Sequence, residues 1–165
     1  MPRLRPLRAA LAAIAMVLAF VSPFYRLEAN APVVLDVTGA VAGGRASFDL
    51  ATLDALQQAR IVTTTPWTQG KTTFDGVDGP AFIKAIGATG KTMKARALND
   101  YAVEIPVADF LTKGVIIATR LNGERIPVRT NGPLWIMYPY DSDPSLQNKT
   151  FTYRAIWQLR SIDVQ

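Results

Sequence analysis

Gly132-Pro133-Leu134-Trp135-Ile136-Met137-Tyr138-Pro139-Tyr140-Asp141 is the stretch of the sequence that says most about the fold. Bulky apolar residues fill positions 134–138, which predicts a short buried strand that stops at Pro139. The Gly-Pro pair before this strand and the Pro-Tyr-Asp sequence after it restrict the backbone, and so fix where the rings and the carboxylate point. Flat aromatic faces beside a carboxylate suit a planar heterocycle with adjacent N–H donors. A core strand followed by a turn is the simpler interpretation of the same residues.

Hydrophobic periodicity and turn residues divide the rest of the chain into short strands and helices. Strands are predicted at 33–38, 60–65, 91–98, 101–105, 115–121, 125–129 and 153–164. Helices are predicted after a cap at Asp49 or Thr52, over 79–88 with Pro80 near the start, and as a brief turn over 106–111. The polar stretch 68–78, with two glycines, predicts a loop, and Asn99-Asp100 and Asn122-Gly123 predict tight hairpin turns. This pattern predicts one α+β domain with a mixed, partly barrel-like sheet and a few short helices.

The beginning of the chain has the composition of an export signal. Arg3, Arg5 and Arg8 precede an uninterrupted apolar run of 13 residues at 9–21. That run is shorter than the roughly 20 residues of a membrane span, so it predicts a signal peptide over 1–29, a domain over 30–165 and a periplasmic protein. An uncleaved membrane anchor is the alternative. The part after residue 29 has 14 basic and 12 acidic side chains, without the basic cluster that would indicate nucleic-acid binding.

Cysteine and histidine are both absent from the sequence. An exported protein without cysteine has no disulfide bonds, no thiolate nucleophile and no soft metal ligand. The lack of histidine further excludes a Ser-His-Asp triad and an imidazole zinc site. These absences exclude more chemistry than any single motif supports.

Four segments together carry a family resemblance. They are Thr63-Thr64-Thr65-Pro66-Trp67, Ala97-Leu98-Asn99-Asp100-Tyr101, the stretch 132–141 and Ala155-Ile156-Trp157-Gln158-Leu159. In this order they resemble the sulfite-oxidase-type molybdopterin-binding fold, and most of all its small periplasmic pterin-binding regulators of the PruR type. The resemblance covers most of the chain after residue 32.

The chain departs from the catalytic members of that family at two positions. Thr63 stands where the resemblance implies a molybdenum-ligating cysteine, and a threonine hydroxyl is neutral and a poor ligand for this metal. Trp135 stands in a Pro-Leu-Trp sequence where the relatives have Pro-Leu-Arg. Arginine suits a phosphate, whereas tryptophan suits an uncharged ring. The two departures predict a pterin without the phosphorylated, metal-bearing tail, unless Trp135 simply fills the core.

The predicted site residues surround such a ring. A carboxylate accepts hydrogen bonds from the amino group and ring N–H of a pterin at once, and Asp100 or Asp141 is expected to do so unless each only caps its own turn. Tyr101 and Tyr138 are expected to stack or to donate a hydrogen bond. The complete predicted set is Thr63, Trp67, Asp100, Tyr101, Arg129, Trp135, Tyr138 and Asp141, with Trp157 assigned to the core as a weaker candidate.

The resemblance implies an exported, non-catalytic protein that binds a reduced pterin without molybdenum. Its expected partner is the periplasmic domain of a membrane-bound enzyme that makes or degrades cyclic di-GMP. A molybdopterin-dependent oxidoreductase, or a subunit of one, with its metal-ligating cysteine replaced is the first alternative. A structural subunit that keeps the fold and binds no small molecule is the second.

Overall fold

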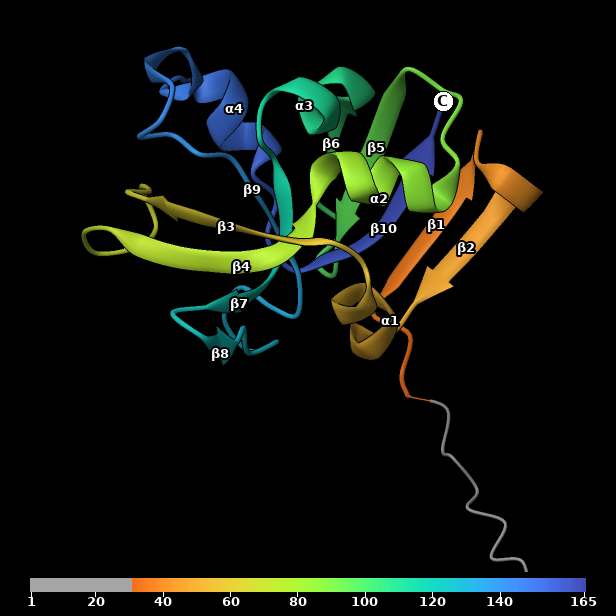
Figure 1. The fold of residues 1–165 in the computed structure, drawn as a ribbon, viewed down its shortest axis with the longest axis horizontal. Coiled ribbons are helices and arrows are strands. Elements are labelled where there is room, and N and C mark those ends of the chain that lie inside the picture. Colours follow the sequence, from red (N-terminus) through yellow and green to blue (C-terminus); the bar gives the residue numbers. More distant parts are fainter. Residues whose placement is uncertain (1–30) are drawn as a thin grey trace, which may run out of the picture.

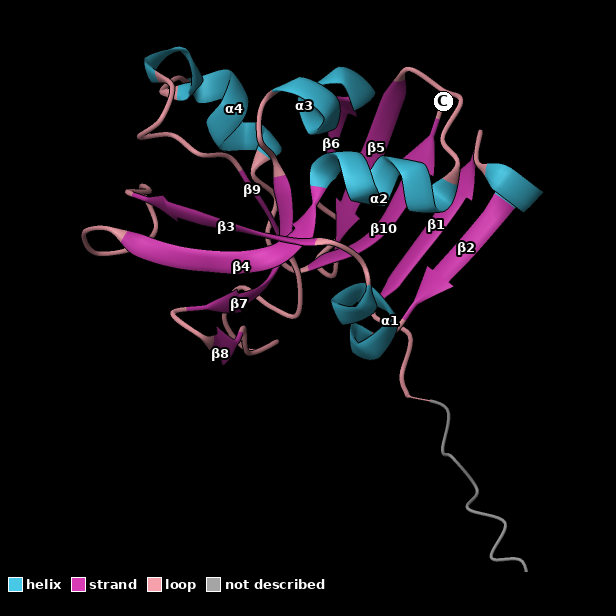
Figure 2. Cartoon of the chain, viewed as in Figure 1, coloured by secondary structure: helices cyan, strands magenta, loops and turns pink. Residues whose placement is uncertain are grey.

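The structure, a computed structural model, describes residues 31–165, and the predicted signal peptide lies outside them. Two five-stranded sheets lie side by side with short helices around them (Figures 1 and 2). In sheet order, the first sheet contains β2 (Arg45–Phe48), β1 (Leu35–Gly39), β10 (Leu159–Val164), β5 (Thr92–Ala97) and β6 (Ala102–Pro106). The second contains β3 (Gln58–Thr63), β4 (Thr72–Asp78), β7 (Ile116–Leu121) and β8 (Glu124–Arg125), with β9 (Trp135–Met137) paired to β7. The helices are α1 (Leu50–Ala55), α2 (Gly79–Ile86), α3 (Val107–Thr112) and α4 (Lys149–Arg154), with short 3-10 turns at Ala42–Gly44 and Pro144–Leu146.

This architecture confirms the predicted α+β class with a mixed sheet, because β1 pairs in parallel with β10 and every other pair is antiparallel. No closed barrel forms among residues 31–165. Within the same residues, no helix combines the length and the apolar character that a membrane crossing requires.

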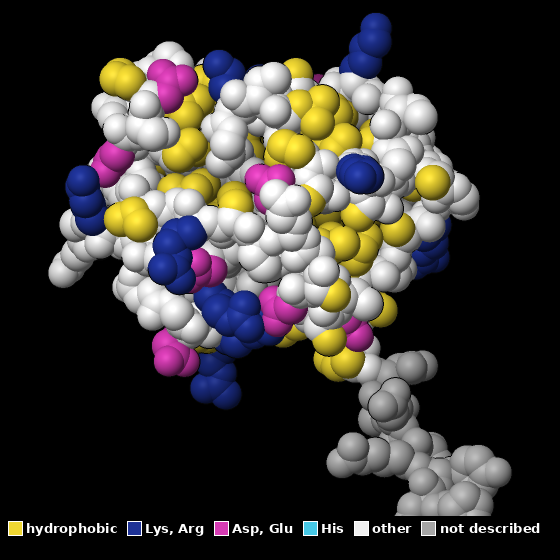
Figure 3. All heavy atoms as spheres, in the orientation of Figure 1, with side chains coloured by type: hydrophobic (Ala, Val, Ile, Leu, Met, Phe, Trp, Pro, Cys, Tyr) yellow, Lys and Arg dark blue, Asp and Glu magenta, His cyan; other side chains and the backbone are white. Residues whose placement is uncertain are grey.

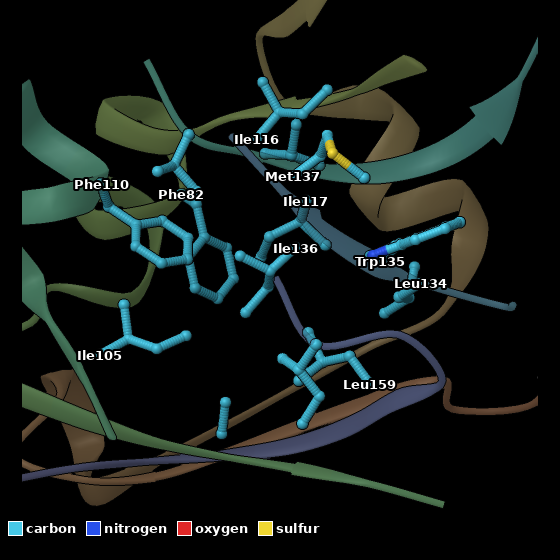
Figure 4. Packing of buried hydrophobic residues seen from close by; sticks show 14 of the residues in the cluster. Phe82, Ile105, Phe110, Ile116, Ile117, Leu134, Trp135, Ile136, Met137 and Leu159 are labelled. Carbon is cyan, nitrogen blue, oxygen red and sulfur yellow. The ribbon is translucent and has the colours of Figure 1, made fainter. Parts of the chain in front are cut away.

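The helix predictions are confirmed and follow from local chemistry. Asp49 and Thr52 form a reciprocal capping box at the start of α1. Pro80 lies in the first turn of α2, and Gly87 ends that helix in the left-handed conformation that glycine adopts without steric cost. Phe82 of α2 packs against Phe110 of α3, with ring centroids 6.1 Å apart, in the core shown in Figure 4.

Three element predictions are wrong. The predicted loop 68–78 contains strand β4, which is central in its sheet. The predicted strand 125–129 shrinks to the two residues of β8, after which the chain turns back toward β9. The predicted strand 153–164 begins only at Leu159, because its first residues complete helix α4.

Ion pairs join α1 to the second sheet. The carboxylate of Asp54 accepts hydrogen bonds from Arg120, at 3.1 Å, and from Arg125. Arg60 and Asp75 form a further pair across β3 and β4, at 2.6 Å. In Figure 3 basic and acidic side chains lie next to each other in the lower left of the view. The charge of each of these arginines therefore has a carboxylate partner.

Candidate functional site

A cavity of about 320 Å³ opens where loops of both sheets meet α4. Its lining residues come from the loop after β3, the end of β5 and the β5–β6 turn, helix α4 and the segment before β10: Trp67, Ala97, Asn99, Tyr101, Thr152, Tyr153, Ala155, Ile156 and Trp157. None of these nine side chains is charged. The volume is at the lower end of the range of small-molecule sites, which suits one compact heterocycle.

Aromatic rings form most of the wall of this cavity. Trp67 and Trp157 are half-buried and meet edge to face, with centroids 5.5 Å apart. Tyr101 and Tyr153 are 45% and 62% exposed, so they stand at the rim. The hydroxyl of Tyr101 donates a hydrogen bond to the carbonyl of Tyr153 at 3.3 Å, which joins the β5–β6 turn to α4. Flat apolar surfaces on more than one side of a cavity are suited to stacking on a planar ring.

Trp135 lies behind this wall and not in the cavity. Its side chain is fully buried, its centroid is 5.7 Å from that of Trp67 and 6.0 Å from that of Trp157, and its indole N–H donates to the carbonyl of Ala155 at 3.2 Å. The expectation that Trp135 stacks on a ligand is therefore wrong for this structure, and the interpretation of Trp135 as core is the correct one. Trp135 supports the two tryptophans that do line the cavity.

Tyr138 is also a core residue. Its ring is fully buried and its hydroxyl donates a hydrogen bond to Asp109 at 2.9 Å. Burial raises the pKa of Tyr138, and the neighbouring Asp109 carboxylate raises it further. Arg154 of α4 donates to the same carboxylate, also at 2.9 Å. Tyr138 thus belongs to a buried network that connects the end of β9 with α3 and α4. It does not line the cavity, so the prediction that it contacts a ligand is not supported by its position.

Thr63 and Asp141 lie 78 positions apart in the sequence and contact each other, but neither of them lines the cavity. The buried hydroxyl of Thr63 accepts the N–H of Asp141 at 3.0 Å. The carboxylate of Asp141 in turn accepts the N–H of Thr64 at 3.1 Å and its hydroxyl at 2.6 Å. These hydrogen bonds from Thr64 lower the pKa of Asp141 below its usual range. The pair fixes the end of β3, so Asp141 is not placed to read the edge of a ligand.

Asp100 and Arg129 are exposed, and neither lines the cavity or the second hollow described below. Asp100 occupies the left-handed position of the β5–β6 turn, with φ of 65°, and lies 3.8 Å from Arg96. Arg129 lies in the loop between β8 and β9. Of the predicted site residues, only Trp67 and Tyr101 line the cavity.

The prediction missed Asn99, Thr152 and Tyr153, and it underrated Trp157. Asn99 stands in a turn that the sequence does indicate, beside the predicted Asp100 and Tyr101. Thr152 and Tyr153 belong to a helix that was predicted in part as strand. Their approach to Trp67 depends on tertiary packing, for which no local sequence signal exists.

A second hollow of about 480 Å³ shares Thr152 with the cavity. It is lined by Thr64, Thr65, Pro66, Tyr140, Gln147, Asn148, Lys149 and Thr152. Most of its polar side chains are already engaged within the protein: Asn148 caps α4, Gln147 donates to the carbonyl of Tyr140, and Tyr140 donates to the carbonyl of Phe151. The polar groups that line the hollow thus mainly stabilise the surrounding loop, whereas the aromatic faces of the cavity are available for a ligand.

Of three comparisons with known proteins, the one with solved structures supports this fold. No protein-family model matches the chain, and no curated protein matches it. Among solved structures the chain is similar to the sulfane dehydrogenase SoxCD from Paracoccus pantotrophus, with a TM-score of 0.59 and 15% sequence identity. The match covers 79% of this chain and 37% of that chain, so this chain spans little more than a third of that protein's length. At this identity the likeness concerns the fold alone, and it supports a sulfite-oxidase-like fold.

Proposed function

We propose that this chain is a non-catalytic protein that binds a reduced pterin in the aromatic cavity. The observation that carries the proposal is the wall of two tryptophans and two tyrosines without a charged lining residue. Stacking favours a planar ring, and the uncharged lining favours a ring without a phosphate, since phosphates are usually held by arginine or lysine. The sulfite-oxidase-like fold supports the choice of a pterin among planar heterocycles.

A molybdopterin-dependent oxidoreductase is the competing proposal, and the chemistry of the donor set argues against it. The position that the resemblance assigns to the metal ligand holds Thr63, whose hydroxyl is buried and already engaged with the N–H of Asp141. A neutral hydroxyl in that state is a poor ligand for molybdenum. The residues present therefore do not fit the metal, and no redox step is assigned to this chain.

The resemblance further supports a regulatory role for the pterin-loaded protein. In this proposal the chain is exported, and its partner is the periplasmic domain of a membrane-bound enzyme of cyclic di-GMP metabolism. A ligand transmits a signal only if it changes the affinity for the partner. A binding assay between the two proteins, with and without pterin, tests this step, and equal affinities in both conditions would overturn it.

The binding proposal is tested by titrating the purified domain with tetrahydropterin under nitrogen and following tryptophan fluorescence. Trp67→Ala and Trp157→Ala each remove one wall, and we expect each to weaken binding by about tenfold or more because a stacked ring is lost. Val62→Ala, which truncates an exposed side chain on β3, is the control and should bind normally. Thermal melting confirms that each variant folds. Unchanged affinity in both folded tryptophan variants would refute the assignment of the site.

A further inference from the structure

We infer that the cavity holds its heterocycle by the acceptor edge, the side that carries the ring carbonyl, and that Asn99 is the residue that determines this specificity. The inference rests on the proposed function and adds the direction from which the ring is recognised. It differs from the sequence-based expectation, in which a carboxylate reads the donor edge of a pterin. Neither Asp100 nor Asp141 lines the cavity, so that expectation has no carboxylate to supply.

The geometry of Asn99 fixes which end of its amide is free. Its side-chain oxygen accepts the N–H of Tyr101 at 3.1 Å, an Asx turn within the β5–β6 connection. This hydrogen bond assigns the oxygen and nitrogen of the amide, which are otherwise hard to distinguish. Within residues 31–165 the amide nitrogen has no hydrogen-bond acceptor. Asn99 therefore presents two N–H donors at the rim of the cavity.

Two further N–H donors at the cavity have no partner among the described residues, whereas two of the hydroxyl protons there are engaged within the protein. The Tyr101 hydroxyl donates to the carbonyl of Tyr153, and the Thr152 hydroxyl donates to the carbonyl of Asn148 at 3.0 Å. By contrast, the indole N–H groups of Trp67 and Trp157 meet no acceptor in the described part of the chain. The amide of Asn99 and the indole groups of Trp67 and Trp157 are thus N–H donors at this cavity without a partner among residues 31–165, and a ligand that satisfies them must bring acceptors.

Donors and acceptors alternate around a pterin ring, and the C4 carbonyl oxygen is the acceptor that lies beside the N3–H donor. The carbonyl oxygen at C4 is an acceptor, whereas the 2-amino group is a donor. In 2,4-diaminopteridine an amino group replaces that carbonyl. The ring keeps its shape and size, but the amide N–H groups of Asn99 then face a donor instead of an acceptor. Because an unmatched polar group loses its hydrogen bond to water on burial, such a replacement weakens binding.

Asn99→Asp is a nearly isosteric reversal of this preference. One carboxylate oxygen can still accept the N–H of Tyr101, while the other replaces the donating NH₂ with an acceptor. Fluorescence titrations under nitrogen of the wild type and of this variant with the tetrahydro forms of pterin and of 2,4-diaminopteridine measure the ratio of the two affinities. We expect the wild type to prefer pterin by about tenfold or more, and N99D to lose or reverse that preference.

Asn122→Asp is the matched control. Asn122 also stands in a hairpin turn, with its side-chain oxygen accepting the N–H of Thr73 at 3.0 Å, and it does not line the cavity. N122D adds the same charge and should keep the wild-type ratio. Asn99→Ser, which keeps an acceptor for the turn but removes the amide donors, should reduce the preference without reversing it, and it serves if N99D does not fold.

The outcomes distinguish a failure of the acceptor-edge inference from a failure of the proposed function. A wild type that binds both rings equally, or a folded N99D with an unchanged ratio, would overturn the acceptor-edge inference while leaving heterocycle binding intact. A wild type that binds neither ring would refute the proposed function itself, and the acceptor-edge inference with it.

Discussion

The hydrogen bonds between Asp141 and the end of β3 show how a single residue can look like a ligand-binding group in the sequence and act as a structural one. Asp141 follows a strand that was correctly placed, and its carboxylate was expected to face a ring. In the structure each of its two oxygens accepts a hydrogen bond from Thr64, and Asp141 does not line the cavity. The sequence indicates the turn but not its partner 77 positions away.

This assignment predicts a pH dependence of stability. Hydrogen bonds from Thr64 lower the pKa of Asp141 in the folded state below the value of about 3.9 expected in the unfolded chain. Their contribution is therefore present above the unfolded pKa and is lost as the pH falls through the folded pKa. Asp141→Asn should be less stable than the wild type at neutral pH, with the difference shrinking as the pH falls below about 4.

Urea unfolding at several pH values measures this difference in the free energy of unfolding. The control is Glu124→Gln, which removes an exposed carboxylate on the short strand β8. A difference between wild type and D141N that stays constant from pH 7 to pH 2 would contradict the structural assignment of Asp141.

Among the elements, α4 is the one on which the site depends most. It contributes Thr152 and Tyr153 to the cavity although it is only six residues long. Isolated helices of that length are not stable, so tertiary contacts must hold it. Arg154 supplies a charged contact, since it donates to the buried Asp109 of α3 at 2.9 Å, and the ring of Phe151 packs against Tyr138 with centroids 5.3 Å apart.

Arg154→Ala should destabilise the protein by about 3 kcal/mol, because it leaves the Asp109 carboxylate buried without its cation. It should also weaken pterin binding, since α4 loses its anchor. Arg154→Lys should restore much of both. Arg96→Ala, which removes a partner of the exposed Asp100, should change stability by less than about 1 kcal/mol. Equal effects of R154A and R96A in denaturant unfolding would exclude this role of Arg154.

The elements also show where prediction from the sequence stops. Helix α2 was predictable because Pro80 and Gly87 mark its two ends locally. Strand β4 was not, because Gly76 in its middle resembles a loop residue. A side chain at that position would overlap the backbone carbonyl of Ile117 in the neighbouring strand β7, so the glycine reflects a close approach of two strands. Such a reason exists only in the folded molecule.

At the scale of the whole molecule, the cavity exists only when both sheets are in place. Trp67 follows β3 of the second sheet, whereas Asn99 and Tyr101 belong to the turn between β5 and β6 of the first. The last strand, β10, lies in the middle of the first sheet between β1 and β5. Its pairing with β1, the first strand, brings the two ends of the described chain together. The sequence predicted the class of fold and two cavity residues, and the remaining ones depend on this long-range arrangement.

The proposal of a pterin-binding protein is tested by producing the full chain in its native host and purifying it with whatever it has bound. Acid denaturation releases the ligand, fluorescence identifies a pterin in the released fraction, and mass spectrometry determines molybdenum in the same sample. We expect a pterin at close to one equivalent per chain and no molybdenum. Molybdenum at close to one atom per chain, or the absence of any pterin together with no binding of added pterin, would contradict it.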